Sequence, residues 1–78
     1  MNMKTLELLT LVQKLMGLQV EFFEKKNKNE REDLYKNEIF PLFLEIDKLA
    51  WEMMPPQMAQ ENHINLLNIN KNMEKMIE

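Results

Sequence analysis

Residues 30–54 read EREDLYKNEIFPLFLEIDKLAWEMM, and this stretch decides the fold. Its apolar residues recur every three or four positions, which is the spacing of one face of an α-helix. The first stripe consists of Tyr35, Ile39, Leu42, Ile46, Leu49 and Met53. The second set consists of Phe40, Leu44, Trp51 and Met54. We therefore expect a helix over residues 30–54 whose apolar arc covers about 200°.

Pro41 lies inside this pattern and has no amide to bond to the carbonyl of Asn37. Either the helix kinks there, or it breaks and Pro41 opens a second helical piece. Because the apolar register continues across Pro41, the kink is favoured. At its start, Asn29 is expected to cap the helix, with Glu32 as the capping-box partner three residues later.

The segments on either side show the same helical periodicity. Residues 3–26 carry two apolar rows that together cover roughly 200°. These rows are Leu8, Leu11, Leu15, Leu18 and Phe22, and Leu9, Val12, Met16, Val20 and Phe23. Residues 57–77 carry a narrower stripe of Met58, Ala59, Leu66, Ile69, Met73, Met76 and Ile77. Pro55 and Pro56 end the second helix, and the third begins there or as late as Asn62.

Composition agrees with an all-α fold in a single domain. One glycine and no serine leave little material for β-turns, whereas the helix-favouring residues Leu, Met, Glu and Lys are abundant. A chain of 78 residues is long enough for one small core. We expect residues 1–78 to form a three-helix antiparallel bundle with up-down-up topology, completed by dimerisation or by a partner.

The chain has too few nucleophilic and acid–base side chains to form a catalytic site. There is no Cys or Ser to act as a nucleophile. His63 is the only histidine, and Gln60 stands where a metal-binding helical bundle would place a Glu. Glu38, Glu45 and Glu52 share one helix edge, which a solvated surface explains better than acid–base catalysis. We expect no enzymatic activity, no cofactor and no metal ion.

Charge and hydropathy limit the possible partners. The net charge is −3 and the chain has one arginine, whereas nucleic-acid binding normally needs a basic surface. No segment approaches the roughly 20 consecutive apolar residues of a membrane span. The absence of cysteine fits a reducing compartment. We therefore expect a cytoplasmic protein without membrane contact.

The wide apolar arcs of the first two helices point to another protein chain as the partner. The narrow third stripe cannot cover both arcs, and exposed apolar strips usually mark interaction sites. Each uncovered large side chain forgoes about 1.5–3 kcal/mol of burial. We expect a second copy, in a homodimer, or another protein to cover the strip. The expected interface residues are Tyr35, Phe40, Phe43, Leu44, Trp51, Met54, Leu18 and Phe22.

One further set of residues consists of Leu34-Tyr35-Lys36-Asn37-Glu38-Ile39-Phe40-Pro41-Leu42, Trp51, Pro56, His63-Ile64 and Asn70. In these residues the sequence resembles the YppE-like family of small helical proteins from Bacillus and its relatives. The resemblance spans residues 5–76 and implies an antiparallel four-helix bundle. It implies no functional residues. This chain departs from that pattern because only three helices are predicted in it.

Together these features favour a non-enzymatic interaction or regulatory protein. We expect a small bacterial or phage factor that binds a host protein through its apolar helical face. The alternative is a small nucleic-acid-binding transcriptional regulator, for which the third helix offers Asn side chains and Lys71 but no Arg.

Overall fold

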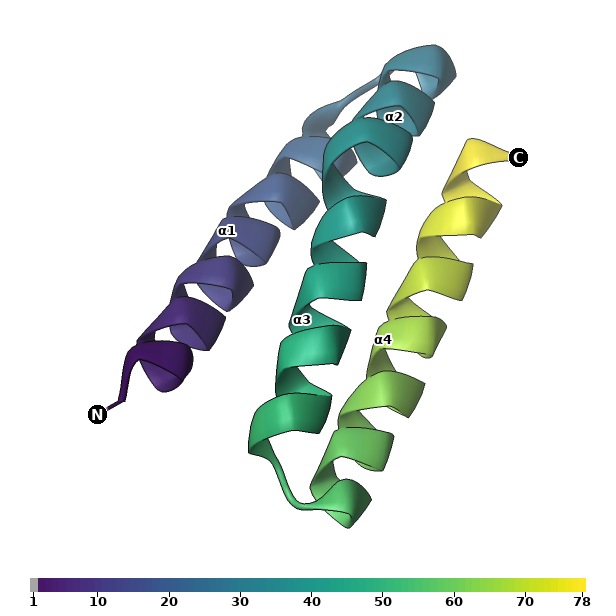
Figure 1. Ribbon diagram of the computed structural model, residues 1–78. Helices are drawn as coiled ribbons and strands as arrows, with labels where there is room; N and C mark the ends of the chain where they lie inside the picture. Colours follow the sequence, from purple (N-terminus) through teal and green to yellow (C-terminus); the bar gives the residue numbers. More distant parts are fainter. Residues whose placement is uncertain (1) are drawn as a thin grey trace.

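The computed structural model describes residues 2–78, which form three antiparallel helical rods (Figure 1). The first rod is α1 (Met3–Glu24). The second is a continuous helical run of α2 (Lys28–Leu34), the π-helix η1 (Tyr35–Ile39) and α3 (Phe40–Met53). The third rod is α4 (Pro56–Ile77). Within the described residues, the predicted all-α bundle of three helices is confirmed.

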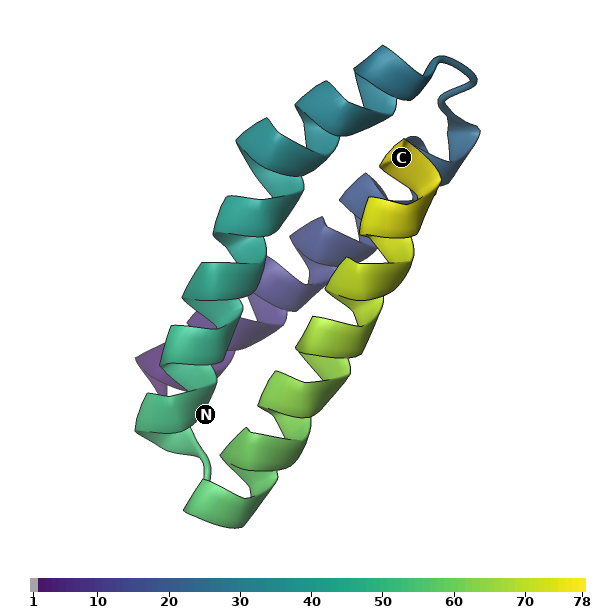
Figure 2. The same cartoon turned by 90° about the vertical axis from the view of Figure 1, so that its right-hand side faces the viewer.

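The second rod stays helical through Pro41 because a π-helix precedes that residue. The backbone amide of Phe40 bonds to the carbonyl of Tyr35, five residues earlier, rather than to the residue four earlier. This wider turn loosens the hydrogen-bond ladder where Pro41 has no amide and where its ring would crowd a carbonyl. The expected kink therefore takes the form of a π-helix, and α2 is inclined to α3 (Figure 2).

The wider turn also changes which residues face the core. An extra residue in η1 rotates α2 by about one position, roughly 100°, relative to α3. Leu34 lies outside the apolar stripe of a regular α-helix, yet it is buried in the structure. The sequence pattern missed Leu34 because it assumed about 3.6 residues per turn along the whole rod.

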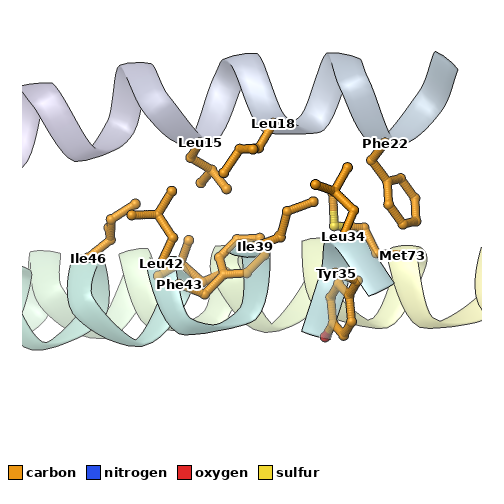
Figure 3. Packing of buried hydrophobic residues seen from close by; sticks show 11 residues of the cluster. Leu15, Leu18, Phe22, Leu34, Tyr35, Ile39, Leu42, Phe43, Ile46 and Met73 are labelled. Atoms are coloured by element: carbon orange, nitrogen blue, oxygen red, sulfur yellow. The ribbon is translucent and has the colours of Figure 1, made fainter. Parts of the chain in front are cut away.

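The core lies where the three rods meet, and α1 and α4 both pack against α3 (Figure 3). Phe22, Ile39 and Met73 come from different rods and are almost completely buried. The other buried apolar residues are Leu15, Leu18, Leu34, Tyr35, Leu42, Phe43, Ile46, Leu49, Ala50, Ala59 and Leu66. Among the described residues no polar or charged residue is fully buried. This chain therefore closes a core from its own side chains.

One helix start differs from the sequence-based expectation, and another agrees with one of the two expected positions. The second rod begins at Lys28, and the side chain of Asn27 caps it by accepting from the amide of Asn29 at 2.7 Å. The expected cap at Asn29 is therefore wrong. The third rod begins at Pro56 and not as late as Asn62. Proline suits the first helical position because its missing amide would have no partner there.

The single arginine joins the connection between α1 and α2 to the end of α4. Arg31 donates from Nε to the carbonyl of Lys25 at 2.9 Å and from Nη1 to the carbonyl of Met76 at 3.0 Å. Its Nη2 also donates to the carbonyl of Lys26 at 3.4 Å. Carbonyls at the ends of helices carry partial negative charge, so a planar guanidinium with several donors suits this position.

Replacing Arg31 with Ala should lower the free energy of unfolding by about 1–3 kcal/mol, because several donors to carbonyl groups are lost. The last turn of α4 should also fray. Lys28→Ala is the matched control, since Lys28 is a cation on the same helix that makes none of these bonds. Urea unfolding measures the free energy, and amide hydrogen exchange locates the fraying. Equal stability of the two variants would contradict this role.

Candidate protein-binding face

One side of the bundle, formed by α3 and α4, exposes large apolar side chains. Phe40, Leu44 and Trp51 follow one another on α3 at spacings of four and seven residues, and Leu67 lies on α4. We call these four residues the α3–α4 face. Their exposed fractions are 42%, 57%, 47% and 44%. Side chains of this kind, gathered on one side of a small protein, are typical of interaction surfaces.

The α3–α4 face is hollowed into a groove of about 200 Å³ between the two helices. Phe43 and Leu66 are buried and form its floor, whereas Phe40, Leu44 and Leu67 are exposed and form its rim. The remaining lining residues are Asp47, His63 and Asn70. The groove is therefore mainly apolar and has a few polar groups, as ligand grooves usually do.

A polar pair crosses the groove from α3 to α4. Nδ1 of His63 lies 3.0 Å from Oδ2 of Asp47, and the ring of His63 lies 6.5 Å from that of Trp51. The other carboxylate oxygen, Oδ1 of Asp47, is buried and has no hydrogen-bond partner among residues 2–78. A buried acceptor without a donor is destabilising. The side chain of Asp47 as a whole is 24% exposed, so its charge can still attract a basic group at the groove.

The structure separates the expected interface residues into two groups. Phe40, Leu44 and Trp51 are exposed on α3, and Met54 is half-buried where α3 ends. The other four are Leu18, Phe22, Tyr35 and Phe43, all of them buried. Their assignment to an interface is corrected, because they pack inside this chain and a partner could reach them only by opening the bundle.

The buried group is shielded because α4 covers more than its narrow stripe suggested. Leu66 and Met73 insert into the core from α4, and Ile69 and Ile77 pack against its edge. These few large side chains close the space between α1 and α3. The expectation that the third helix is too narrow therefore holds for the outer surfaces and fails for the core.

Tyr35 joins the second rod to α4. Its hydroxyl donates to Oδ1 of Asn70 at 2.7 Å and lies 3.3 Å from Oε1 of Glu74. Asn70 in turn donates to the carbonyl of Leu66 at 3.0 Å. Burial, followed by the nearby charge of Glu74, raises the pKa of Tyr35 to about 12. These contacts give Tyr35 a structural role beside the groove rather than a place on its surface.

The single tyrosine makes a pH-dependent test possible. The fold favours the neutral phenol, so Tyr35 contributes stability below its ordinary pKa of 10.0 and loses it as the pH rises toward about 12. Phenolate absorbance of the folded protein should therefore rise with a midpoint near pH 12. Tyr35→Phe is the control: it abolishes the signal and should cost about 1 kcal/mol of stability. A midpoint near pH 10.0 in folded protein would contradict these contacts.

A second uncovered surface lies on α1. Its members, which we call the α1 strip, are Leu6, Leu9, Met16, Val20 and Phe23, all of them between 46% and 60% exposed. Gly17, the only glycine, lies beside this strip in the middle of the helix. A glycine there is less favourable than alanine by about 1 kcal/mol. Apart from its chain neighbours and the backbone of its own helical turn, no atom lies within 4 Å of the position that a Cβ at Gly17 would occupy.

Other kinds of site are not found in the part of the chain that the structure describes. No three His, Cys, Asp or Glu side chains of residues 2–78 lie close enough to hold a metal ion. No helix of residues 2–78 has both the length and the hydropathy that a membrane span needs. Glu52 is one of the three glutamates that share a helix edge. It pairs with Lys4 of α1 at 3.5 Å, which is a surface contact between two rods.

Two parts of the groove could not be found from the sequence. Leu67 lies off the apolar stripe of the third helix, and its position beside Phe40 and Leu44 depends on how α4 packs. The pairing of Asp47 with His63 depends on the same packing. The one available signal was Asp47 itself, an acidic residue that interrupts the apolar arc of the second helix.

Comparison of this chain with family models, with curated proteins and with solved structures gave no match. The function of this chain is therefore inferred from the geometry and chemistry of its two uncovered surfaces.

Proposed function

We propose that this chain is a non-enzymatic interaction protein that binds an amphipathic helix of another protein in the groove of the α3–α4 face. The observation that carries this proposal is the pair of exposed aromatic side chains, Phe40 and Trp51, beside an apolar groove between two antiparallel helices. Tryptophan and other large aromatic residues are enriched among the side chains that dominate binding energy. A helix laid along such a groove is a common mode of peptide recognition.

The spacing along α3 determines what the partner helix presents. Phe40, Leu44 and Trp51 repeat at four and seven residues, so a helix lying alongside meets them with apolar residues at three- and four-residue spacing. Covering the exposed half of each side chain contributes about 1 kcal/mol. Each 1.4 kcal/mol changes the affinity roughly tenfold, so no single one of these contacts is enough for tight binding.

Asp47 adds a polar requirement to this apolar partner. Its Oδ1 atom is buried without a donor, while Oδ2 faces His63. The side chain of Asp47 is 24% exposed at the groove, so a Lys or Arg of the partner placed beside it would match its negative charge. We therefore propose an apolar helix that carries one basic residue. The expected homodimer would use a different surface, on α1.

A photo-reactive amino acid in place of Leu44 tests this proposal in the cells that make the protein. It should cross-link to a helix of another protein, and mass spectrometry should map the cross-link beside a basic residue of that helix. Trp51→Glu in the same chain should reduce the yield at least tenfold, because it places a charge in the apolar contact. Leu6→Glu, outside the α3–α4 face, is the control and should leave the yield unchanged.

Three results would overturn the proposal. Cross-links from position 44 only to copies of this chain would make the groove a self-association surface. Cross-links to nucleic acid would support the alternative of a transcriptional regulator. An equal yield from the Trp51→Glu variant would show that the groove is not the binding site. Circular dichroism establishes that each variant keeps its helical content.

A further inference from the structure

The α1 strip has a spacing that is characteristic of helix pairing. Leu6, Leu9, Met16, Val20 and Phe23 belong to a series with steps of three, four, three, four and three residues, completed by Gln13. This is the heptad pattern by which one helix packs against another. The strip faces away from the core, which α1 contacts through a different row that includes Leu15, Leu18 and Phe22.

The spacing of this series, although not its residues, is the same from either end of the helix. In an antiparallel pair of α1 helices, Leu6 of one copy would lie opposite Phe23 of the other, and Leu9 opposite Val20. Gln13 would then lie opposite Met16. Such a surface is complementary to itself under a two-fold rotation, which is what the interface of a symmetric dimer requires. Among residues 2–78, the other exposed large apolar side chains do not form a series of this length.

Gly17 gives an independent reason for a close neighbour. A glycine inside a helix destabilises it relative to alanine. No close contact within the chain requires a glycine at position 17, because a Cβ there would meet open space. Thr10, one heptad earlier, turns its hydroxyl onto its own helix and donates to the carbonyl of Leu6 at 2.9 Å. The strip is thus bordered by two small positions, which let a second helix approach closely.

We infer that a second copy of this chain covers the α1 strip, with the two α1 helices antiparallel. The size of the surface is compatible with this arrangement. A standard interface takes about 800 Å² from each partner, and this chain exposes 5615 Å². A helix of 22 residues is about 33 Å long, so its whole outer side supplies much of the required area. The inference goes beyond the proposed function and does not depend on it.

Sedimentation equilibrium of the purified chain over the micromolar range tests the association. The wild-type chain should sediment as a dimer. Val20→Glu and Gly17→Leu should weaken association at least tenfold while keeping the helical content, because one buries a charge and the other fills the space for the second helix. Leu67→Glu is the control on the α3–α4 face and should still dimerise.

Two outcomes would overturn the inference. One is a wild-type chain that stays monomeric into the high micromolar range. The other is a dimer that Leu67→Glu breaks and Val20→Glu does not, which would transfer the contact to the α3–α4 face. The first outcome has no bearing on cross-linking of a different protein from position 44, so failure of this inference alone is distinguishable from failure of the proposed function. The second outcome would count against both, and cross-links from position 44 only to copies of this chain would confirm it.

Single cysteines test the orientation, because the chain contains none of its own. Chains with Leu6→Cys should form a disulfide with chains that carry Phe23→Cys. Leu6→Cys alone should not, because its two copies would be separated by about 26 Å along the helix axis, whereas a disulfide needs Cα atoms within about 7 Å. Efficient oxidation of Leu6→Cys with itself would show a parallel pair and overturn the antiparallel arrangement.

Discussion

The widened turn before Pro41 is the constraint on which the rest of the bundle depends. The rod formed by α2, η1 and α3 packs against both of the other rods, so its shape sets theirs. A proline inside a regular α-helix would cost about 3 kcal/mol or more, and the π-helix avoids much of this conflict. The same turn rotates Leu34 into the core and lets Tyr35 reach α4. Local backbone geometry thus decides which side chains hold the bundle together.

Because one chain closes its own core, the uncovered surfaces are not needed for folding. If buried residues such as Phe22 and Phe43 had to be shared with a partner, the separate chain would not fold. The structure buries them without a partner, and the α1 strip and the α3–α4 face lie outside the core. Binding at either surface would then add stability to a chain that is already folded. Such surfaces suit reversible association better than obligatory assembly.

The two surfaces differ in chemistry, and that difference separates their proposed partners. The α1 strip has a self-complementary spacing and small residues at its border, which suit a second copy of the chain. The α3–α4 face has exposed aromatic residues and the partly exposed carboxylate of Asp47, which suit a different helix with a basic residue. They lie on different rods, so one chain could use both surfaces at once.

The sequence predicted the helices well because their apolar periodicity is long and regular. It missed Leu34 because periodicity assumes one helical geometry, and it placed the cap at Asn29 because Asn27 offers the same chemistry two residues earlier. It predicted that Phe40 and Trp51 lie in an interface; both are exposed, and the interface itself stays a prediction.

The sequence also placed core residues in the interface, because arc width alone does not say how far a neighbouring helix reaches. Phe22 and Phe43 are the clearest cases, since α4 shields both through a few large side chains. The sequence did not predict the roles of Arg31 and His63, because their hydrogen-bond partners lie on other rods.

Nuclear Overhauser measurements on a mixture of isotope-labelled and unlabelled chains test most directly whether each chain closes its own core and shares only its outer surface. Contacts between chains should arise from Met16, Val20 and Phe23, while Leu18 and Phe22 should show contacts only within one chain. Contacts between chains at Leu18 or Phe22 would show a shared core and would contradict this account.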